Sequence, residues 1–249
     1  MRLRRLEVNG GRVNEKPTWR LTLPPTAKGY ADAQIDDYGL AGAGRRSYPW
    51  RPGTRMHLRA RFSHPAEQLA GTAGFGFWNS SFADPSVRRP ALPQATWFFF
   101  ASPPTDLPLA PVGPGRGWFA STLDATSGSA LAMIPLAPAV LLLNQFSVLR
   151  RRIWPGIRRR LKISFAPLSH TMQDWHDYTL HWLPEGCSFL IDGLPVLTTP
   201  FSPKGPLGFV CWVDNQYLIA TNRGRLRWGT LTTTAEQVLE VDNLSITHQ

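Results

Sequence analysis

The chain has 249 residues and is 43% hydrophobic, which is enough for one well-buried core. Its 27 basic and 17 acidic residues give a formal net charge of +10, which suits an anionic membrane surface, an acidic ligand or nucleic acid. Two cysteines are too few for a disulfide framework, so the sequence excludes a small disulfide-rich secreted scaffold.

The N-terminal residues 1–17 are basic at the start but have no apolar run behind them. This pattern does not match a secretory signal peptide, and we expect a cytoplasmic protein. We expect a single domain over residues 1–249, in which residues 1–54 form the first strands and loops.

Alternation of apolar and polar residues predicts β-strands along most of the chain. In residues 55–62, Leu58, Ala60 and Phe62 share one face, while His and Arg side chains share the other. A short Gly-containing turn after the expected strand 175–182 predicts a hairpin with the expected strand 188–193. The further expected strands are 175–182, 188–193, 207–213 and 238–246. Many short strands bounded by Gly and Pro predict an all-β jelly-roll sandwich of two antiparallel sheets.

Residues 94–104, with the sequence QATWFFFASPP, predict a strand that is aromatic on both faces. Alternate residues of a strand point to opposite faces, so Trp97 pairs with Phe99 and Phe98 pairs with Phe100. One pair is expected in the core and the other on the wall of a ligand site. The pattern is compatible with either assignment.

Residues 131–163 interrupt the strand pattern with an apolar run that is followed by a basic one. Residues 139–154 lack proline and are apolar around most of their circumference, which predicts a helix that Pro155 and Gly156 end or kink. Prolines and amide side chains interrupt the apolar run, so we do not expect it to span a membrane.

Two interpretations of this helical insertion stay open. An interfacial helix would place apolar side chains in the acyl boundary and arginines at anionic headgroups, at the inner face of the membrane. The alternative is a helix packed on the core with an exposed basic tail. Nucleic acid is not an expected partner, because the sequence has no RNA-binding motif. The expected membrane contacts are Leu141, Leu142, Phe146, Leu149, Arg150, Arg151, Arg152, Trp154, Arg158, Arg159 and Arg160.

A motif near the middle of the chain resembles the family-16 glycoside hydrolases, which include laminarinases and lichenases. It consists of Trp175-His176-Asp177-Tyr178 and Trp182, a turn, and then Phe189-Leu190-Ile191-Asp192-Gly193. Weaker similarities occur in the family's order at 58–63, 74–79 and 240–246. The resemblance implies a concanavalin A-like jelly roll of two antiparallel sheets with a ligand cleft on the concave face.

The same resemblance implies where catalytic acids would lie. The family carries them as E-x-D-x-E or E-x-D-x-x-E on the strand after the Phe-Trp strand. Here that strand is residues 95–102, which contain no Asp or Glu. Retaining hydrolysis needs two carboxylates about 5–5.5 Å apart, so we do not expect the family mechanism. The remaining candidate acids are Asp36, Asp37, Asp84 and Asp214.

An aromatic wall with few polar groups favours an apolar or amphiphilic ligand, because sugar hydroxyls need hydrogen-bonding partners. We therefore expect a non-glycosidase that binds a lipid-like or terpenoid-like ligand in an aromatic concave cleft at a membrane surface. The expected ligand contacts are Trp78, Asn79, Trp97, Phe98, Phe99, Phe100, Trp212, Asp214 and Tyr217.

Several further hypotheses accompany this one. A buried acid with a raised pKa and an aromatic face that stabilises a cation would suit a cofactor-free cyclisation or isomerisation. A carbohydrate-binding or weakly hydrolytic relative of the family is the first alternative, and a structural membrane-peripheral protein is the second. No metal or cofactor is expected, since the sequence has no metal-ligand spacing and no phosphate-binding loop.

Overall fold

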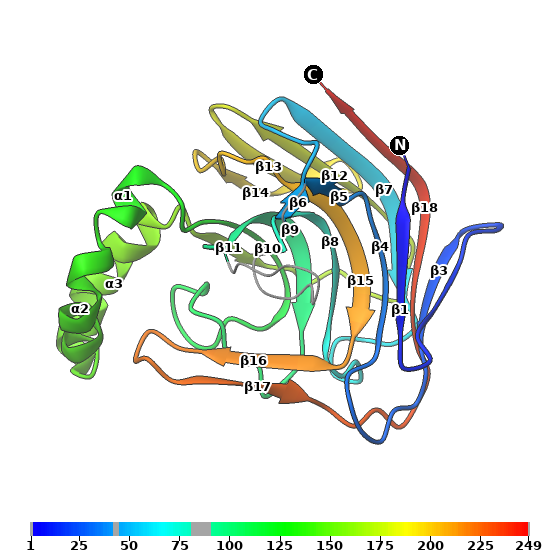
Figure 1. Ribbon diagram of the computed structural model, residues 1–249, viewed down its shortest axis with the longest axis horizontal. Helices are drawn as coiled ribbons and strands as arrows, with labels where there is room; N and C mark the ends of the chain where they lie inside the picture. Colours follow the sequence, from blue (N-terminus) through cyan, green and yellow to red (C-terminus); the bar gives the residue numbers. More distant parts are fainter. Residues whose placement is uncertain (1, 42–44, 81–90, 249) are drawn as a thin grey trace.

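The computed structural model describes residues 2–41, 45–80 and 91–248. Its body is a sandwich of two antiparallel seven-stranded sheets (Figure 1), which confirms the predicted fold class. Sheet A has the order β1 (Arg4–Val8), β4 (Asp32–Asp36), β15 (Gly208–Asp214), β8 (Thr72–Trp78), β9 (Gln94–Ala101), β10 (Gly117–Asp124) and β11 (Ser164–Pro167). Sheet B has the order β14 (Leu194–Thr199), β13 (Gly186–Ile191), β12 (His176–Leu183), β7 (Thr54–Phe62), β18 (Gln237–His248), β3 (Trp19–Leu23) and β2 (Arg12–Asn14).

Two ribbons and a group of short helices complete the described fold. The ribbons are β5 (Gly39–Ala41) with β6 (Arg45–Ser47), and β16 (Gln216–Ala220) with β17 (Leu226–Thr230). The helices are α1 (Gly128–Leu131), the 3-10 helix η1 (Ile134–Leu136), α2 (Ala137–Leu143) and α3 (Ser147–Arg160).

The strands predicted from alternation are present. Those expected at 55–62, 207–213 and 238–246 are β7, β15 and β18. The predicted hairpin is β12 with β13, whose register runs from Tyr178 opposite Ile191 to Leu183 opposite Gly186. Period-2 patterning was sufficient for β7, β12 and β13 because each has one face in the core, whereas β15 is a continuous apolar run that is buried on both faces.

Aromatic side chains from both sheets build the core between them. The ring centroid of Phe98 in sheet A lies 5.3 Å from that of Phe189 and 5.1 Å from that of Tyr178 in sheet B. Both pairs are edge-to-face, the arrangement that the ring quadrupole favours. Phe100 lies in the same core, and both cysteines are buried there as free thiols.

The helix expected over 139–154 was wrong in its bounds. α2 ends at Leu143 and α3 begins at Ser147, so two helices replace the continuous one. The break has a tertiary cause, because the side chain of Asn144 is fully buried and donates from Nδ2 to the carbonyl of Asn222, 2.9 Å away.

Pro155 does not end the second of these helices. It lies inside α3, which runs on to Arg160. A proline removes one backbone donor from a helix. The turns beyond it are nevertheless held in place, because Ile157 is only 6% exposed and its carbonyl accepts a hydrogen bond from the Leu161 N–H at 2.9 Å.

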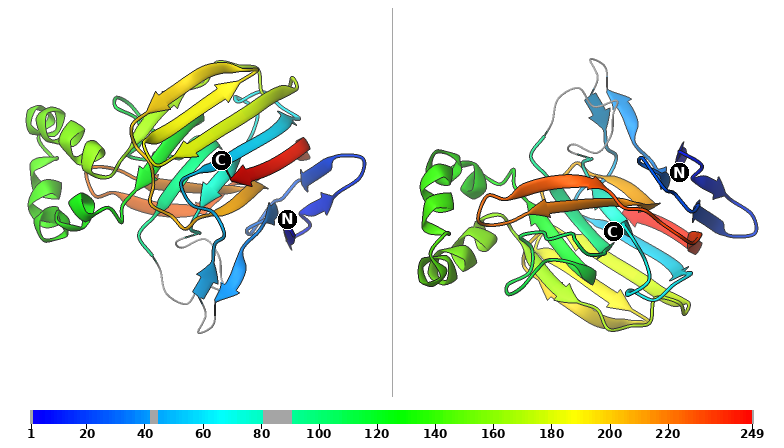
Figure 2. Two further views of the ribbon diagram at one scale, coloured as in Figure 1. Left: turned by 90° about the horizontal axis from the view of Figure 1, so that it is seen from above. Right: turned by 90° about the horizontal axis from the view of Figure 1, so that it is seen from below.

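The helices lie at one end of the molecule beside the tip of the β16–β17 ribbon (Figures 1 and 2). Gln145 Nε2 donates to the carbonyl of Arg223 at 3.0 Å, next to the Asn144 contact. We call residues 128–160 and 216–230 together the basic lobe. No helix in the described part of the chain has the length and apolar character needed to cross a membrane.

Two glycines of β8 allow large rings to lie over the middle of sheet A. A Cβ on Gly74 would be 2.3 Å from the carbonyl oxygen of Phe98 and 3.2 Å from the Trp212 ring. A Cβ on Gly76 would be 2.7 Å from that of Trp97. The indoles of Trp97 and Trp212 therefore lie where a side chain at Gly74 or Gly76 would have to be.

We predict that Gly74→Ala destabilises the fold by at least about 3 kcal/mol, because the added methyl meets backbone atoms of a central strand. Gly128→Ala is the matched control, since its Cβ would meet no atom within 4 Å. Its unfolding free energy should stay within about 0.5 kcal/mol of the wild type. Urea unfolding of both variants measures the difference, and equal midpoints would contradict the packing argument.

Candidate ligand-binding face

Sheet A carries a second set of aromatic side chains, on the face turned away from sheet B. On β9, Trp97 and Phe99 belong to this outer cluster, whereas Phe98 and Phe100 belong to the core between the sheets. Strand alternation thus settles the question that the sequence left open. Phe98 and Phe100, at most 1% exposed, are removed from the set of expected ligand contacts.

Five rings from four adjacent strands form what we call the outer patch. They are Trp78, Trp97, Phe99, Phe119 and Trp212. Trp97 is the central ring: its centroid lies 5.2 Å from that of Trp78 and 5.9 Å from that of Trp212. Four of the expected ligand contacts therefore meet in one place, although they come from β8, β9 and β15.

The outer patch is covered rather than open. Trp97 is 6% exposed and Phe99 is 8% exposed. Leu107 and Leu109, from the connection between β9 and β10, pack against the cluster on one side. Tyr38 packs against it from the far end of β4. The expected aromatic cleft is thus largely filled by the chain's own side chains.

The covering segment is tied to the basic lobe. The Asp106 N–H donates to the Leu218 carbonyl of β16 at 3.0 Å. Farther along, the carbonyl of Leu109 accepts a hydrogen bond from Arg158 Nε of α3 at 3.1 Å. Any widening of the patch would therefore involve a segment that is bonded to both parts of the lobe.

Two carboxylates lie opposite each other at one end of the patch. Asp32 of β4 and Asp214 of β15 are register partners on adjacent strands, on the same outer face as Trp212. The Trp212 indole N–H donates to Thr72 Oγ1 at 2.9 Å, and this hydroxyl donates to Asp214 Oδ1 at 2.8 Å. The aromatic patch and the carboxylate pair are thus one hydrogen-bonded unit.

Burial sets the protonation of this pair. It raises the pKa of Asp214 to about 6. Burial, with the Asp214 carboxylate as the second cause, also raises the pKa of Asp32. Asp32 is 1% exposed, and neither of its oxygens accepts a hydrogen bond of normal geometry from the described residues, although the Tyr30 phenol lies beside it. The pair is suited to holding a proton near neutral pH.

Two of the other candidate acids have structural partners. Asp36 is buried and accepts hydrogen bonds from Arg4, with Nη2 to Oδ2 at 2.8 Å. Asp37 accepts from the Trp50 indole at 2.5 Å and from the Phe209 N–H at 2.8 Å, and burial raises its pKa to about 6. Asp36 thus joins β4 to β1, and Asp37 joins the segment after β4 to Trp50 and to β15. Asp84 lies outside the described residues.

The remaining expected ligand contacts lie elsewhere. Asn79 donates from Nδ2 to the Leu92 carbonyl at 2.9 Å and accepts from the Gln94 N–H at 3.1 Å, so it holds the connection between β8 and β9. Tyr217 lies on the β16–β17 ribbon with its ring against Gly229. Neither residue is in the outer patch.

Asp32 was not among the candidate acids predicted from the sequence. The signal was available, because Asp32, Gln34 and Asp36 alternate on β4 and therefore share one face. What the pattern does not contain is the pairing of β4 with β15, which places Asp214 opposite Asp32. That neighbour comes from the far end of the chain.

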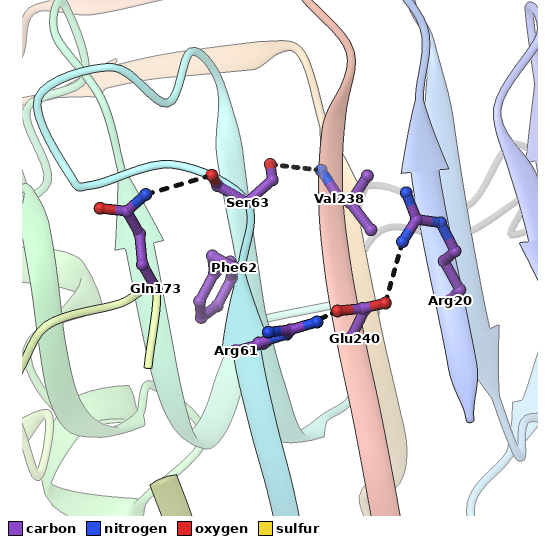
Figure 3. Close-up of a pocket in the computed structure, with 7 residues that line it drawn as sticks. All are labelled: Arg20, Arg61, Phe62, Ser63, Gln173, Val238 and Glu240. Carbon is purple, nitrogen blue, oxygen red and sulfur yellow. Dashed lines mark hydrogen bonds and ion pairs between the residues drawn. The ribbon is translucent and has the colours of Figure 1, made fainter. Parts of the chain in front are cut away.

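A hollow of about 320 Å³ lies away from this patch, at sheet B (Figure 3). Its charged groups satisfy one another: Glu240 accepts from Arg20 at 2.9 Å and from Arg61 at 2.6 Å. We assign it no ligand for that reason. Within the described ranges, no group of three His, Cys, Asp or Glu side chains is arranged to hold a metal ion.

Two solved structures are similar to this chain in fold. One is an immunostimulatory antigen and pseudo β-1,3-glucanase of Mycobacterium tuberculosis, with 12% identity and a TM-score of 0.52 over 96% of this chain and 78% of that one. The other is a β-glucanase of Bacillus licheniformis, with 10% identity and a TM-score of 0.51 over 99% of this chain and 92% of that one.

These similarities confirm, for the fold, the resemblance to family-16 glycoside hydrolases that the sequence motif indicated. At these identities the likeness shows the fold alone. No protein-family model matches the sequence, and no curated protein matches it.

Asp214 and Asp37 provide a paired pH test. All three hydrogen bonds to Asp214 end on Oδ1, which Asn retains, so Asp214→Asn removes a buried charge without losing an acceptor. Both oxygens of Asp37 accept hydrogen bonds, so Asp37→Asn must set an amide N–H against a donor. The two variants therefore have opposite expected effects, although both carboxyls have a pKa of about 6.

We predict that Asp214→Asn raises the free energy of unfolding at about pH 7.5 by about 1–3 kcal/mol, and that Asp37→Asn lowers it. A raised folded-state pKa means that the native state binds a proton that the unfolded chain has released. Wild-type stability at Asp214 should therefore increase as the pH falls from about 6 to about 4, and the advantage of Asn should vanish there. Thermal unfolding across this range measures both, and a pH-independent difference would overturn the assignment.

Proposed function

We propose that this protein recognises a sugar ring on the outer patch and does not hydrolyse glycosidic bonds. The observation that carries the proposal is the outer face of β9, where Ala95, Trp97, Phe99 and Ala101 leave no carboxylate among the aromatic rings. Indole faces stack on the C–H faces of sugars. The fold shared with two glucanase-like structures supports the same ligand class.

Unpartnered polar atoms around the rings support a polar ligand. Among the described residues, the Trp97 indole N–H and the Tyr38 hydroxyl are buried without a hydrogen-bond partner, and so are both Asp32 oxygens. A buried donor or acceptor without a partner costs about 1–3 kcal/mol. Sugar hydroxyls both donate and accept, so a sugar ring at Trp97 would satisfy its indole N–H. Asp32 and Tyr38 lie at opposite ends of β4 and would each need a different part of an oligosaccharide. Entry of the sugar requires the segment that carries Leu107 and Leu109 to move.

The carboxylate pair does not favour hydrolysis. Retaining hydrolysis needs one carboxylate as an exposed nucleophile and a second as the acid. Asp32 is 1% exposed, and Oδ1 of Asp214 already accepts three hydrogen bonds. The pair is better suited to hydrogen bonding with a ligand at the end of the patch.

We predict that the protein binds β-1,3-linked glucan oligosaccharides, the polymer class named for one structural neighbour, and releases no reducing ends. Trp97→Ala should weaken binding at least about tenfold, whereas Trp97→Phe should retain part of it. Trp228→Ala is the matched control, because Trp228 is 71% exposed on β17. Calorimetric titration and a reducing-sugar assay test this. Hydrolysis by the wild type, or full affinity in Trp97→Ala, would overturn it.

An apolar or amphiphilic ligand is the second candidate. The observation that favours it is the closure of the patch: the central rings are 6–8% exposed and are covered by leucine side chains. Burial of an apolar ligand there would contribute about 25 cal/mol for each Å² removed from water. The raised pKa of Asp214, about 6, supports it as the acid that would protonate such a ligand.

For this second candidate, we expect organic extracts of the purified protein to contain a lipid or terpenoid, detectable by mass spectrometry, in an amount comparable to the protein. Trp97→Ala should reduce the extracted amount several-fold and Leu194→Ala should not, because Leu194 is 67% exposed on β14 and lies in neither the outer patch nor the basic lobe. If extracts of the wild type contain no such compound, this candidate is eliminated and the sugar proposal is unaffected.

A further inference from the structure

The basic lobe contains nearly all of the net charge of the protein. Residues 128–160 and 216–230 include nine of the 27 basic residues and none of the 17 acidic ones. The rest of the chain therefore has 18 basic and 17 acidic residues, which nearly cancel, against a total of +10. A charge separated in this way indicates a specific anionic partner at the lobe rather than a general need for solubility.

The same lobe also contains most of the exposed apolar side chains. Of the thirteen large apolar residues that are exposed in the described chain, ten lie in it. They are Leu131, Ile134, Leu136, Leu141, Leu142, Leu143, Phe146, Val148, Leu226 and Trp228. Leu142 and Val148 are each 65% exposed, and Trp228 is 71% exposed. Exposed apolar side chains gathered in this way mark an interaction surface.

Helix α3 shows how the lobe is oriented. Ile157 is buried and Arg158 donates to the carbonyl of Leu109, so this side of the helix faces the body of the protein. Arg151 and Arg152 are exposed one turn after Val148, and Arg159 and Arg160 are exposed at the end of the helix. Cationic and apolar side chains therefore point to solvent together.

We propose that the basic lobe docks on an anionic lipid surface, with its leucines, Phe146 and Trp228 in the acyl boundary and its exposed arginines at the headgroups. Anionic headgroups match the charge, and the hydrocarbon boundary covers the apolar side chains. A second copy of the chain does not fit, because it would bring nine positive charges against nine. Nucleic acid matches the charge but would leave the leucines in water.

The structure refines the set of membrane contacts expected from the sequence. Arg150 is partly buried and donates from Nη1 to the Asn144 carbonyl at 2.8 Å, and Arg158 faces the body. Leu149 and Trp154 are also partly buried. The contact set therefore excludes these four and gains Trp228 together with Arg223, Arg225 and Arg227. The proposal uses no residue of the outer patch and is independent of the proposed function.

The test is flotation of the full chain with phosphatidylcholine vesicles that contain roughly one quarter phosphatidylglycerol, at low salt. We expect the wild type to float, and to float less in high salt or with phosphatidylcholine alone. Replacement of Arg151, Arg152, Arg159 and Arg160 by Gln should weaken binding at least about tenfold. The matched control replaces Arg2, Arg12, Arg51 and Arg55, which are exposed elsewhere on the protein. It should bind at least about fivefold more tightly than the lobe variant.

A second variant separates lipid from other polyanions. Replacing Leu142, Phe146 and Trp228 by Ser keeps every charge, so it should weaken vesicle binding and leave the binding of heparin or DNA unchanged. Unaltered thermal unfolding of all variants would show that they are folded, as expected for exposed positions. The proposal is overturned if the wild type does not float, if the control loses as much affinity as the lobe variant, or if the serine variant floats like the wild type.

Discussion

The fold depends on a strand that is buried on both faces. β9 lies inside sheet A between β8 and β10, so its side chains cannot avoid either surface of the sheet. Phe98 and Phe100 fill the space between the two sheets, while Trp97 and Phe99 form the centre of a second cluster outside. The glycines of β8 are needed for this packing, because a Cβ at Gly74 would meet the backbone of β9.

Burial on both faces has a consequence for chemistry. The outer face of this sheet holds indoles at its centre, and its carboxylates lie at the end, on β4 and β15. Asp32 and Asp214 are taken out of water together, which raises the pKa of both. Such a pair is suited to holding a proton near neutral pH rather than to acting as two ionised acids. The outer face therefore differs in design from a hydrolytic cleft, although the surrounding sandwich is the same.

The net charge of the molecule is concentrated in one part of the chain. The sandwich is nearly neutral, and the basic lobe has nine arginines without an acidic residue. The segment that covers the outer patch is bonded to both parts of the lobe, through Asp106 to Leu218 and through Leu109 to Arg158. The proposed docking of the lobe and the proposed entry of a ligand into the patch therefore involve the same segment of the chain.

The sequence alone determined the strands, the jelly-roll class, the absence of acids from 95–102 and the basic apolar insertion, because these are local properties of patterning and composition. It did not determine which face of β9 meets the core, since alternation is symmetric until the strand has neighbours. It also did not show the break at Asn144, whose amide is bound by the β16–β17 ribbon. Tertiary structure decided these points and placed Asp214 opposite Asp32, because strand pairing joins residues that are far apart in the chain.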